Sequence, residues 1–194
     1  MMKMNNILVI IPTYNEIENI SKIINAVFNT DLSIDVLIVD DLSPDGTGEE
    51  VRKLMKIFSN SLFLETKLEK QGLGAAYVHG FRWALKRKYD YIFEMDADFS
   101  HQPMELKSMI KILDSEADVV VGSRYINGVN VVNWPLSRVL LSYFASLYVQ
   151  IITSMPIKDA TAGFVGYKMS VLKTINLDQM KFIGYAFQIE LKYK

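Results

Sequence analysis

Two carboxylates separated by one residue, Asp96 and Asp98, are the part of this sequence most directly suited to chemistry. They follow residues 91–93 (YIF), an aromatic and β-branched run that predicts a buried strand. Side chains two positions apart in an extended chain point to the same side, so both carboxylates can face one ligand. Such a pair suits a hard divalent cation that is shared with substrate phosphates. The alternative is a polar turn that begins the next helix.

Polar loops also follow two other predicted strands. Tyr14 and Glu16 come after the first strand, and Asp41 comes after the second. In open α/β sheets, ligands bind outside the carboxyl ends of the strands, where these loops would meet the carboxylate pair. A nucleotide suits that cleft, with Tyr14 against the base or ribose, Asp41 accepting from base N–H groups and Glu16 accepting from the ribose. Singly, each residue has a plainer alternative as a helix cap, a turn residue or a half-buried side chain.

The elements that must position these residues alternate between strand and helix. Strands are predicted at 7–11, 34–39, 62–65, 91–95 and 118–121, and helices at 17–28, at 47–58, at 72–88 and from 103 onward. This alternation predicts an α/β fold with a mostly parallel sheet and helices on both of its faces. The chain has 194 residues and no recognisable linker, so we expect a single domain, 1–194.

Composition excludes several classes of function. The formal net charge of -1 gives no electrostatic reason to expect a nucleic-acid partner. The chain contains no cysteine, which excludes disulfides, thiolate catalysis and cysteine-ligated metals. Its first residues lack the layout of a signal peptide, so we expect a cytoplasmic protein.

The glycine-rich stretch 71–77 (QGLGAAY) argues against two common nucleotide motifs. Tyr77 stands where a dinucleotide fingerprint needs its third small residue, and the Gly-Lys-Ser/Thr of a P-loop is missing. Hydride transfer and nucleotide hydrolysis are therefore disfavoured. Gly72 and Gly74 are better explained by a close backbone approach to a ligand or by a tight helix start.

An uncharged segment, 139–157, follows Arg138. Its 19 residues are barely enough to span a bilayer, and several serine, threonine and glutamine residues dilute it. Two alternatives to a membrane span stay open. The segment is either a buried helix or a helix that lies on a membrane surface with its apolar face inward.

Six short motifs, taken together, resemble one family. They are residues 12–16 (PTYNE), 39–47 (VDDLSPDGT), 72–77 (GLGAAY), 95–101 (MDADFSH), 122–125 (GSRY) and 185–190 (YAFQIE). In this order they are similar to the family-2 glycosyltransferases of the dolichol-phosphate (polyprenol-phosphate) mannosyltransferase type. The resemblance implies a GT-A fold, a nucleotide-sugar donor, a divalent metal and inversion at the anomeric carbon.

By position, the resemblance also implies the roles of individual residues. It assigns nucleoside binding to Pro12, Tyr14, Glu16, Val39 and Asp41. It assigns the diphosphate and a metal ion, Mg²⁺ or Mn²⁺, to Asp96, Ala97 and Asp98. It assigns donor or acceptor phosphate to Arg124, and the lipid phosphate to Arg138 and Ser142.

The acceptor implied by the resemblance is a phosphate monoester, which is already anionic near neutral pH because its second pKa is about 6. A strong general base is therefore not required. We expect Asp98, Arg124 and Arg138 to carry catalysis, through the metal at the leaving diphosphate and through clamping of the attacking phosphate. If the acceptor were instead a sugar hydroxyl, Glu190 would be the candidate base.

The resemblance favours GDP-mannose as donor and polyprenyl (dolichyl) phosphate as acceptor. The alternatives are a related enzyme that uses UDP-glucose or a non-lipid acceptor, and an inactive nucleotide-sugar-binding fragment. The sequence ends at Lys194, before a basic loop that family members carry, so we expect the domain to lack its C-terminal end. We expect a peripheral protein at the cytosolic face of a membrane, with a separate membrane subunit as a further partner to be tested.

Overall fold

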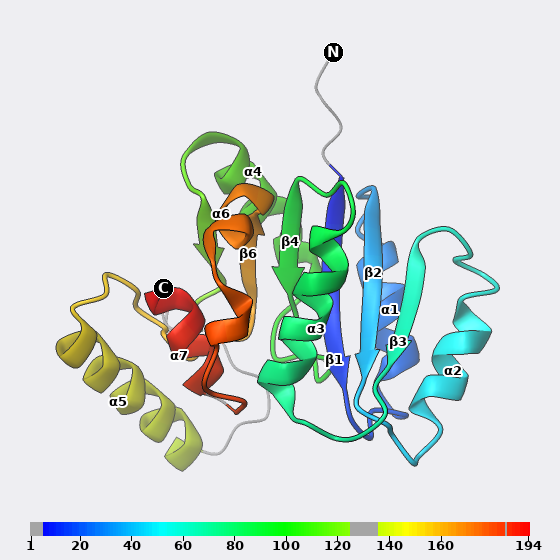
Figure 1. The fold of residues 1–194 in the computed structure, drawn as a ribbon, viewed down its shortest axis with the longest axis horizontal. Coiled ribbons are helices and arrows are strands. Elements are labelled where there is room, and N and C mark those ends of the chain that lie inside the picture. The colour runs from blue at the N-terminus through cyan, green and yellow to red at the C-terminus, as the bar shows by residue number, and fades with distance from the viewer. Residues whose placement is uncertain (1–5, 125–135, 185) are drawn as a thin grey trace.

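The computed structural model describes residues 6–124, 136–184 and 186–194, without the side chains of Leu136 and Arg138. Its described strands form one six-stranded sheet in the order β3-β2-β1-β4-β6-β5 (Figure 1). The strands are β1 (Ile7–Thr13), β2 (Ile34–Asp40), β3 (Leu62–Thr66), β4 (Tyr91–Glu94), β5 (Val119–Val121) and β6 (Val165–Lys168). β1 pairs in parallel with β2 and β4, and β2 pairs in parallel with β3, whereas β6 runs antiparallel to both β4 and β5.

Helices cover both faces of the sheet. They are α1 (Ile20–Phe28), α2 (Thr47–Leu54), α3 (Leu73–Leu85), η1 (Pro103–Glu105), α4 (Leu106–Ser115), α5 (Leu136–Thr153), α6 (Met169–Thr174), η2 (Leu177–Gln179) and α7 (Ala186–Tyr193). Apolar residues of α1, α2 and α4 share one core with the sheet, and those of α3, α6 and α7 share the other. In Figure 1, α3 crosses the face toward the viewer while α1 lies behind the sheet. The predicted mostly parallel α/β fold with helices on both faces is confirmed.

Strand β1 shows why the sequence builds two cores. Val9 and Ile11 point into the core beneath α1, while Leu8 and Ile10 point into the core beneath α3. All four side chains are fully buried, so the strand reads as a continuous apolar run rather than as an alternating one. Because β1 is packed on both faces, it fixes the position at which the polar loop after its C-terminal end leaves the sheet.

The five strands predicted from sequence are confirmed within two residues at each end. The first helix begins at Ile20 rather than Ile17, and residues 17–19 form a turn in which the backbone N–H of Ile17 donates to the carboxylate of Asp45 at 3.0 Å. Strand β6 was not predicted. It has four residues with a glycine in the middle, and its partners β4 and β5 lie far from it in the sequence.

Helix α5 corresponds to the uncharged segment and lies at the edge of the molecule (Figure 1). Much of its apolar surface is exposed, in particular at Leu140, Leu141, Tyr143, Phe144, Leu147, Tyr148, Ile151 and Ile152. The buried-helix alternative for this segment is therefore wrong. Among the described residues, no helix is both long and apolar enough to cross a membrane.

Gly166 sits where strand β6 passes between the side chains of its two neighbours. A Cβ added there would lie 2.4 Å from Cε1 of Phe93 and 2.9 Å from Cγ1 of Val120. We expect Gly166→Ala to lower the free energy of unfolding by about 1–3 kcal/mol, because the ring of Phe93 must leave its packed position. Chemical denaturation followed by circular dichroism measures the change.

The matched control is Gly184→Ala, since a Cβ at Gly184 meets nothing within 4 Å. We expect this control to stay within about 0.5 kcal/mol of the unsubstituted chain. Equal midpoints for the two variants would contradict the packing described for β6.

Candidate active site

The loops that follow β1 and β2 are tied together by Asp40. The Thr13 hydroxyl donates to Oδ1 of Asp40 at 3.0 Å, and the Ser43 hydroxyl donates to the same oxygen at 2.6 Å. The backbone N–H of Asp41 donates to the carbonyl of Thr13 at 2.9 Å. These short bonds hold the loops of neighbouring strands at one edge of the sheet, as the parallel arrangement predicts.

A cavity of about 360 Å³ opens at this edge. It is lined by most of the predicted donor residues, namely Pro12, Tyr14, Glu16, Asp41, Asp96, Ala97 and Asp98. Two predicted donor residues do not line it. The Val39 side chain is fully buried in the core beneath α3, and Arg124 lines a second cavity instead. The structure thus brings residues from three strand ends into one nucleotide-sized cleft that carries several carboxylates.

The carboxylate of Asp41 already has hydrogen-bond and ion-pair partners within the chain. Its Oδ2 accepts from the backbone N–H groups of Gln71 at 3.0 Å and Gly72 at 2.8 Å. Its Oδ1 lies 2.9 Å from Nζ of Lys67, and both side chains are almost fully buried. The two atoms form an ion pair without the alignment of a hydrogen bond. Asp41 therefore anchors the loop 67–72, and a bound base must share this carboxylate with the loop.

The anchored loop places Lys70 over the cleft. Its ammonium lies 3.4 Å from the centroid of the Tyr14 ring, within the range of a cation–π interaction. Lys70 and Tyr14 both line the donor cavity. Sequence reasoning missed Lys70, because an isolated lysine in a polar loop carries no local signal.

Gly72 and Gly74 serve close packing of the chain against itself. Gly72 precedes α3 with a positive φ of 88°, and the N–H of Gly74 donates to the carbonyl of Ile183 at 2.8 Å. A Cβ on Gly74 would lie 2.9 Å from the carbonyl oxygen of Phe182. Of the two explanations given for these glycines, the tight helix start is confirmed at Gly72. A close backbone approach to a ligand stays a prediction, since Gly72 also lines the donor cavity.

Asp96 and Asp98 form the acidic centre of the site. The hydroxyl of Tyr77 donates to Oδ1 of Asp96 at 3.2 Å, and the backbone N–H of Ser100 donates to Oδ1 of Asp98 at 2.9 Å. Burial, together with the nearby charge of Asp98, raises the pKa of Asp96 to about 6. A bound cation would oppose this effect by stabilising the ionised carboxylate.

The donor set at this centre is small. Among the described residues, no cluster of three or more acidic, histidine or cysteine side chains could hold a metal. Mg²⁺ is commonly bound by one or two carboxylates, with phosphate oxygens and water in its other coordination positions. The carboxylates of Asp96 and Asp98 match this pattern, and they are compatible with Mn²⁺ as well. The residues present therefore fit a divalent cation that binds together with a diphosphate.

A second cavity, of about 350 Å³, lies on the other side of the carboxylates. Asp96 and Asp98 line both cavities, and Arg124, Ser142 and Gln188 line the second one. The predicted acceptor residue Ser142 is therefore at the site. The side chain of Arg138, the other predicted acceptor residue, lies outside the described residues.

Arg124 is fixed by a buried carboxylate. Its Nε and Nη2 donate to the two oxygens of Asp159 at 2.8 and 2.6 Å, and Nη2 also donates to the hydroxyl of Thr161 at 2.7 Å. Burial alone would raise the pKa of Asp159, but the hydrogen bonds and charge of Arg124 hold it below its usual value. This bidentate pairing sets the plane of the guanidinium at the wall of the second cavity.

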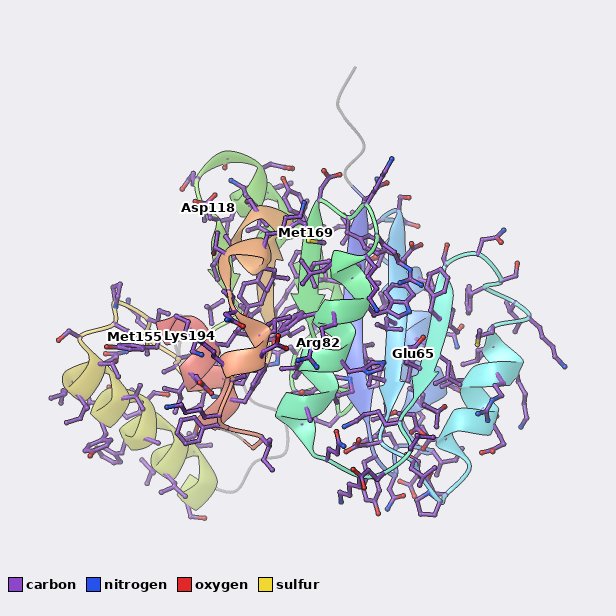
Figure 2. The ribbon with its side chains drawn as sticks, in the orientation of Figure 1. Glu65, Arg82, Asp118, Met155, Met169 and Lys194 are labelled. Atoms are coloured by element: carbon purple, nitrogen blue, oxygen red, sulfur yellow. The ribbon has the colours of Figure 1, made fainter. Side chains whose placement is uncertain are left out.

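Glu190, the candidate base considered from sequence, and His79 both lie away from the acidic centre. Glu190 accepts from the backbone N–H groups of Lys181 at 2.9 Å and Phe182 at 3.0 Å, and it lines neither cavity. It anchors the chain before α7, so its role as a candidate base is not supported. His79 pairs with Glu65 at 3.0 Å at the end of β3, where Figure 2 labels Glu65.

His101, the last residue of the motif at 95–101, also lies at the site. It lines the second cavity, and its ring lies 5.1 Å from that of Phe164. Burial and the charge of Arg124 lower its pKa to about 4, so it is neutral at physiological pH. A neutral, largely buried imidazole does not add positive charge to this wall of the cavity.

Comparison with known proteins identifies the family. Residues 8–175 match the profile of glycosyl transferase family 2. A polyprenol monophosphomannose synthase from Mycolicibacterium smegmatis is 43% identical over 187 residues, which cover 96% of this chain and 71% of that protein. An undecaprenyl-phosphate mannosyltransferase from Micrococcus luteus is 42% identical, over 97% of this chain and 76% of that protein.

Solved structures support the fold alone, because their identity to this chain is low. A mannosyltransferase from Pyrobaculum calidifontis in complex with GDP-Man and Mn²⁺ superposes with a TM-score of 0.63 at 18% identity, over 98% of this chain and 52% of that one. The UDP complex of glucosyl-3-phosphoglycerate synthase from Mycobacterium tuberculosis gives a TM-score of 0.68 at 16% identity, over 96% of this chain and 64% of that one. The chain spans between half and two thirds of these two structures. It has the predicted GT-A fold and belongs to glycosyl transferase family 2.

Proposed function

We propose that this protein transfers mannose from GDP-mannose to a polyprenyl phosphate, with inversion and with a divalent cation at Asp96 and Asp98. The single observation that carries the proposal is the position of these two carboxylates between two cavities. One cavity is lined by most of the residues expected to hold a nucleoside, and the other is lined by Arg124 and Ser142. The names of the two relatives described above support mannose and a polyprenyl phosphate as the transferred sugar and the acceptor.

On the donor side, the residues of the first cavity bind and orient the nucleotide sugar. Tyr14 presents its ring to the base or ribose, and Glu16 accepts hydrogen bonds from the ribose. Asp96 and Asp98 hold the cation, which neutralises negative charge on the departing diphosphate. GDP-mannose is preferred to UDP-glucose because both relatives are named for mannose or phosphomannose.

On the acceptor side, the attacking group is an oxygen of a phosphate monoester, so no side chain has to remove a proton. Arg124 faces the second cavity with its guanidinium plane already fixed by Asp159. Ser142 adds a hydroxyl donor from α5, and Arg138 precedes it by one helical turn. These groups would align the acceptor phosphate with the anomeric carbon across the carboxylates.

The exposed apolar side chains of α5 support a lipid acceptor. They extend from Leu140 to Ile152 on the helix that also carries Ser142. A contiguous apolar surface of this kind on a folded chain marks a contact with another apolar phase. Insertion of α5 into the surface of a membrane would place the second cavity at the depth of lipid phosphates. We propose peripheral binding at the cytosolic face of a membrane, and the need for a separate membrane subunit stays a prediction.

The donor site is tested by calorimetric titration of GDP-mannose and of UDP-glucose, with and without Mn²⁺. We expect Mn²⁺ to strengthen GDP-mannose binding, and Asp98→Asn to weaken the Mn²⁺-supported affinity by about tenfold or more, because one anionic ligand is lost. The matched control is Asp118→Asn, whose carboxylate is exposed and pairs with Lys168 at the far end of the sheet (Figure 2).

Metal-independent binding that Asp98→Asn leaves unchanged would contradict the proposed metal site. A preference for UDP-glucose would keep the site and change the donor, which moves the function to a glucosyltransferase. Binding of neither nucleotide sugar by the unsubstituted chain would contradict the proposed function itself.

The membrane-facing role of α5 is tested by co-sedimentation with phosphatidylcholine vesicles. We expect the double substitution of Ile151→Ser and Ile152→Ser to reduce vesicle binding by roughly tenfold, since each isoleucine loses on the order of 1 kcal/mol of apolar burial in the membrane. Both side chains are exposed, at 69% and 65%, so the fold should tolerate the change.

The control for this experiment carries Ile57→Ser and Ile112→Ser, two exposed isoleucines outside α5. Equal vesicle binding by both double variants would show that α5 is not the membrane contact. That result would leave the donor site untouched.

A further inference from the structure

Lys192, on the C-terminal helix α7, turns its ammonium inward beneath the acidic centre. Its Nζ donates to the carbonyl of Ala162 at 2.7 Å and to the carbonyl of Ala160 at 3.2 Å. The same nitrogen contacts Oε1 and the carbonyl oxygen of Gln188 at 3.0 and 3.3 Å. An ammonium group has three N–H donors, so these four oxygens saturate it.

The chain segment that Lys192 holds, residues 159–163, touches both halves of the site. Asp159 and Thr161 fix Arg124, as described above. At the other end of the segment, Gly163 packs directly on Asp96, since a Cβ there would lie 2.7 Å from Oδ2 of that carboxylate. One short segment therefore positions a wall residue of the acceptor cavity and a carboxylate of the acidic centre.

The charged groups around Lys192 also favour an ammonium group at this position. It interacts electrostatically with three acidic side chains, Glu94, Asp159 and Asp96, and with the positive charge of Arg124. Glu94 and Asp159 are fully buried. Burial lowers the pKa of Lys192, and the charge of Glu94 opposes this effect. Removal of the ammonium would leave this group of carboxylates with Arg124 as its main compensation.

We propose that Lys192 is a positioning residue, which holds segment 159–163 in the conformation that sets Asp96 for the cation and Arg124 for the acceptor phosphate. It lines neither cavity and acts through the carbonyls of Ala160 and Ala162. The inference rests on the proposed function for its consequence in binding. Its structural part, the restraint of the segment, stands independently and is tested without any ligand.

The first experiment measures amide hydrogen exchange of the ligand-free chain. Lys192→Met keeps the length of the side chain and removes its donors. We expect the amides of Arg124 and Ala162, which donate to Asp159 at 3.0 and 3.3 Å, to exchange at least tenfold faster in this variant. Amides of β1 should exchange at an unchanged rate, which separates release of the segment from general destabilisation.

The second experiment measures the affinity for GDP in the presence and absence of Mn²⁺. Lys192→Met should weaken the Mn²⁺-supported affinity by tenfold or more, in the range known for residues that orient metal ligands, and leave the metal-free affinity within about twofold. Lys192→Arg, which keeps the charge and several donors, should restore most of the effect. The matched control is Lys194→Met, two residues later and just past the end of α7 (Figure 2), whose ammonium donates to the carbonyl of Gln179 at 2.8 Å.

Lys192→Gln, which retains one amide donor, replaces the methionine variant in both experiments if that variant does not fold. It should produce the same changes at smaller size. A folded Lys192→Met or Lys192→Gln with unchanged exchange at Arg124 and Ala162 would overturn the inference, and so would unchanged Mn²⁺-supported affinity. If the unsubstituted chain shows no Mn²⁺-dependent GDP binding, the proposed function fails, while the exchange experiment still decides the role of Lys192.

Discussion

Compensation of buried negative charge at the carboxyl end of β4 is the constraint on which this structure depends. Glu94 and Asp159 are fully buried, and Asp96 beside them is partly buried. Burial raises the pKa of Glu94 and of Asp96, because an isolated buried carboxylate is costly. Arg124 compensates Asp159 with two hydrogen bonds, and the ammonium of Lys192 lies among all three carboxylates. Among the described residues, Asp96 accepts one hydrogen bond from a side chain, that of the Tyr77 hydroxyl, and its raised pKa indicates that this compensation is incomplete. A divalent cation would complete it.

This electrostatic arrangement also divides the site into two halves. The first half is built on parallel strands, whose polar loops are held together by Asp40 and Asp41. The second half is built on the antiparallel strand β6 and the segment before it, which carries Asp159 and Gly163. The carboxylates at the end of β4 lie where the two halves meet, so a donor on one side and an acceptor on the other would approach each other there.

The sequence was enough to predict features formed by neighbouring residues, but not contacts between residues that lie far apart in the chain. The buried run of β4 is a local pattern, so a strand period was enough to predict it. Asp96 and Asp98 follow directly in the chain, but they lie past the end of the strand, with Asp98 in a turn. Lys192 has no such signal, because a lysine at this point of an amphipathic helix is ordinarily a surface residue. Its inward direction follows from the packing of α7 through Phe187 and Leu191 against strands that lie distant in sequence. The partnership of Asp41 with Lys67 was missed for the same reason.

The central claim is that Asp96 and Asp98 join a nucleotide-sugar cavity to a lipid-phosphate cavity. Its most direct test is transfer of radiolabelled mannose from GDP-mannose to undecaprenyl phosphate in detergent, with Mn²⁺. The account predicts a labelled lipid product that partitions into the organic phase, is absent with a chelator and is absent when the lipid lacks its phosphate. Labelled product that forms equally well without the metal, or only with a soluble saccharide acceptor, would contradict it.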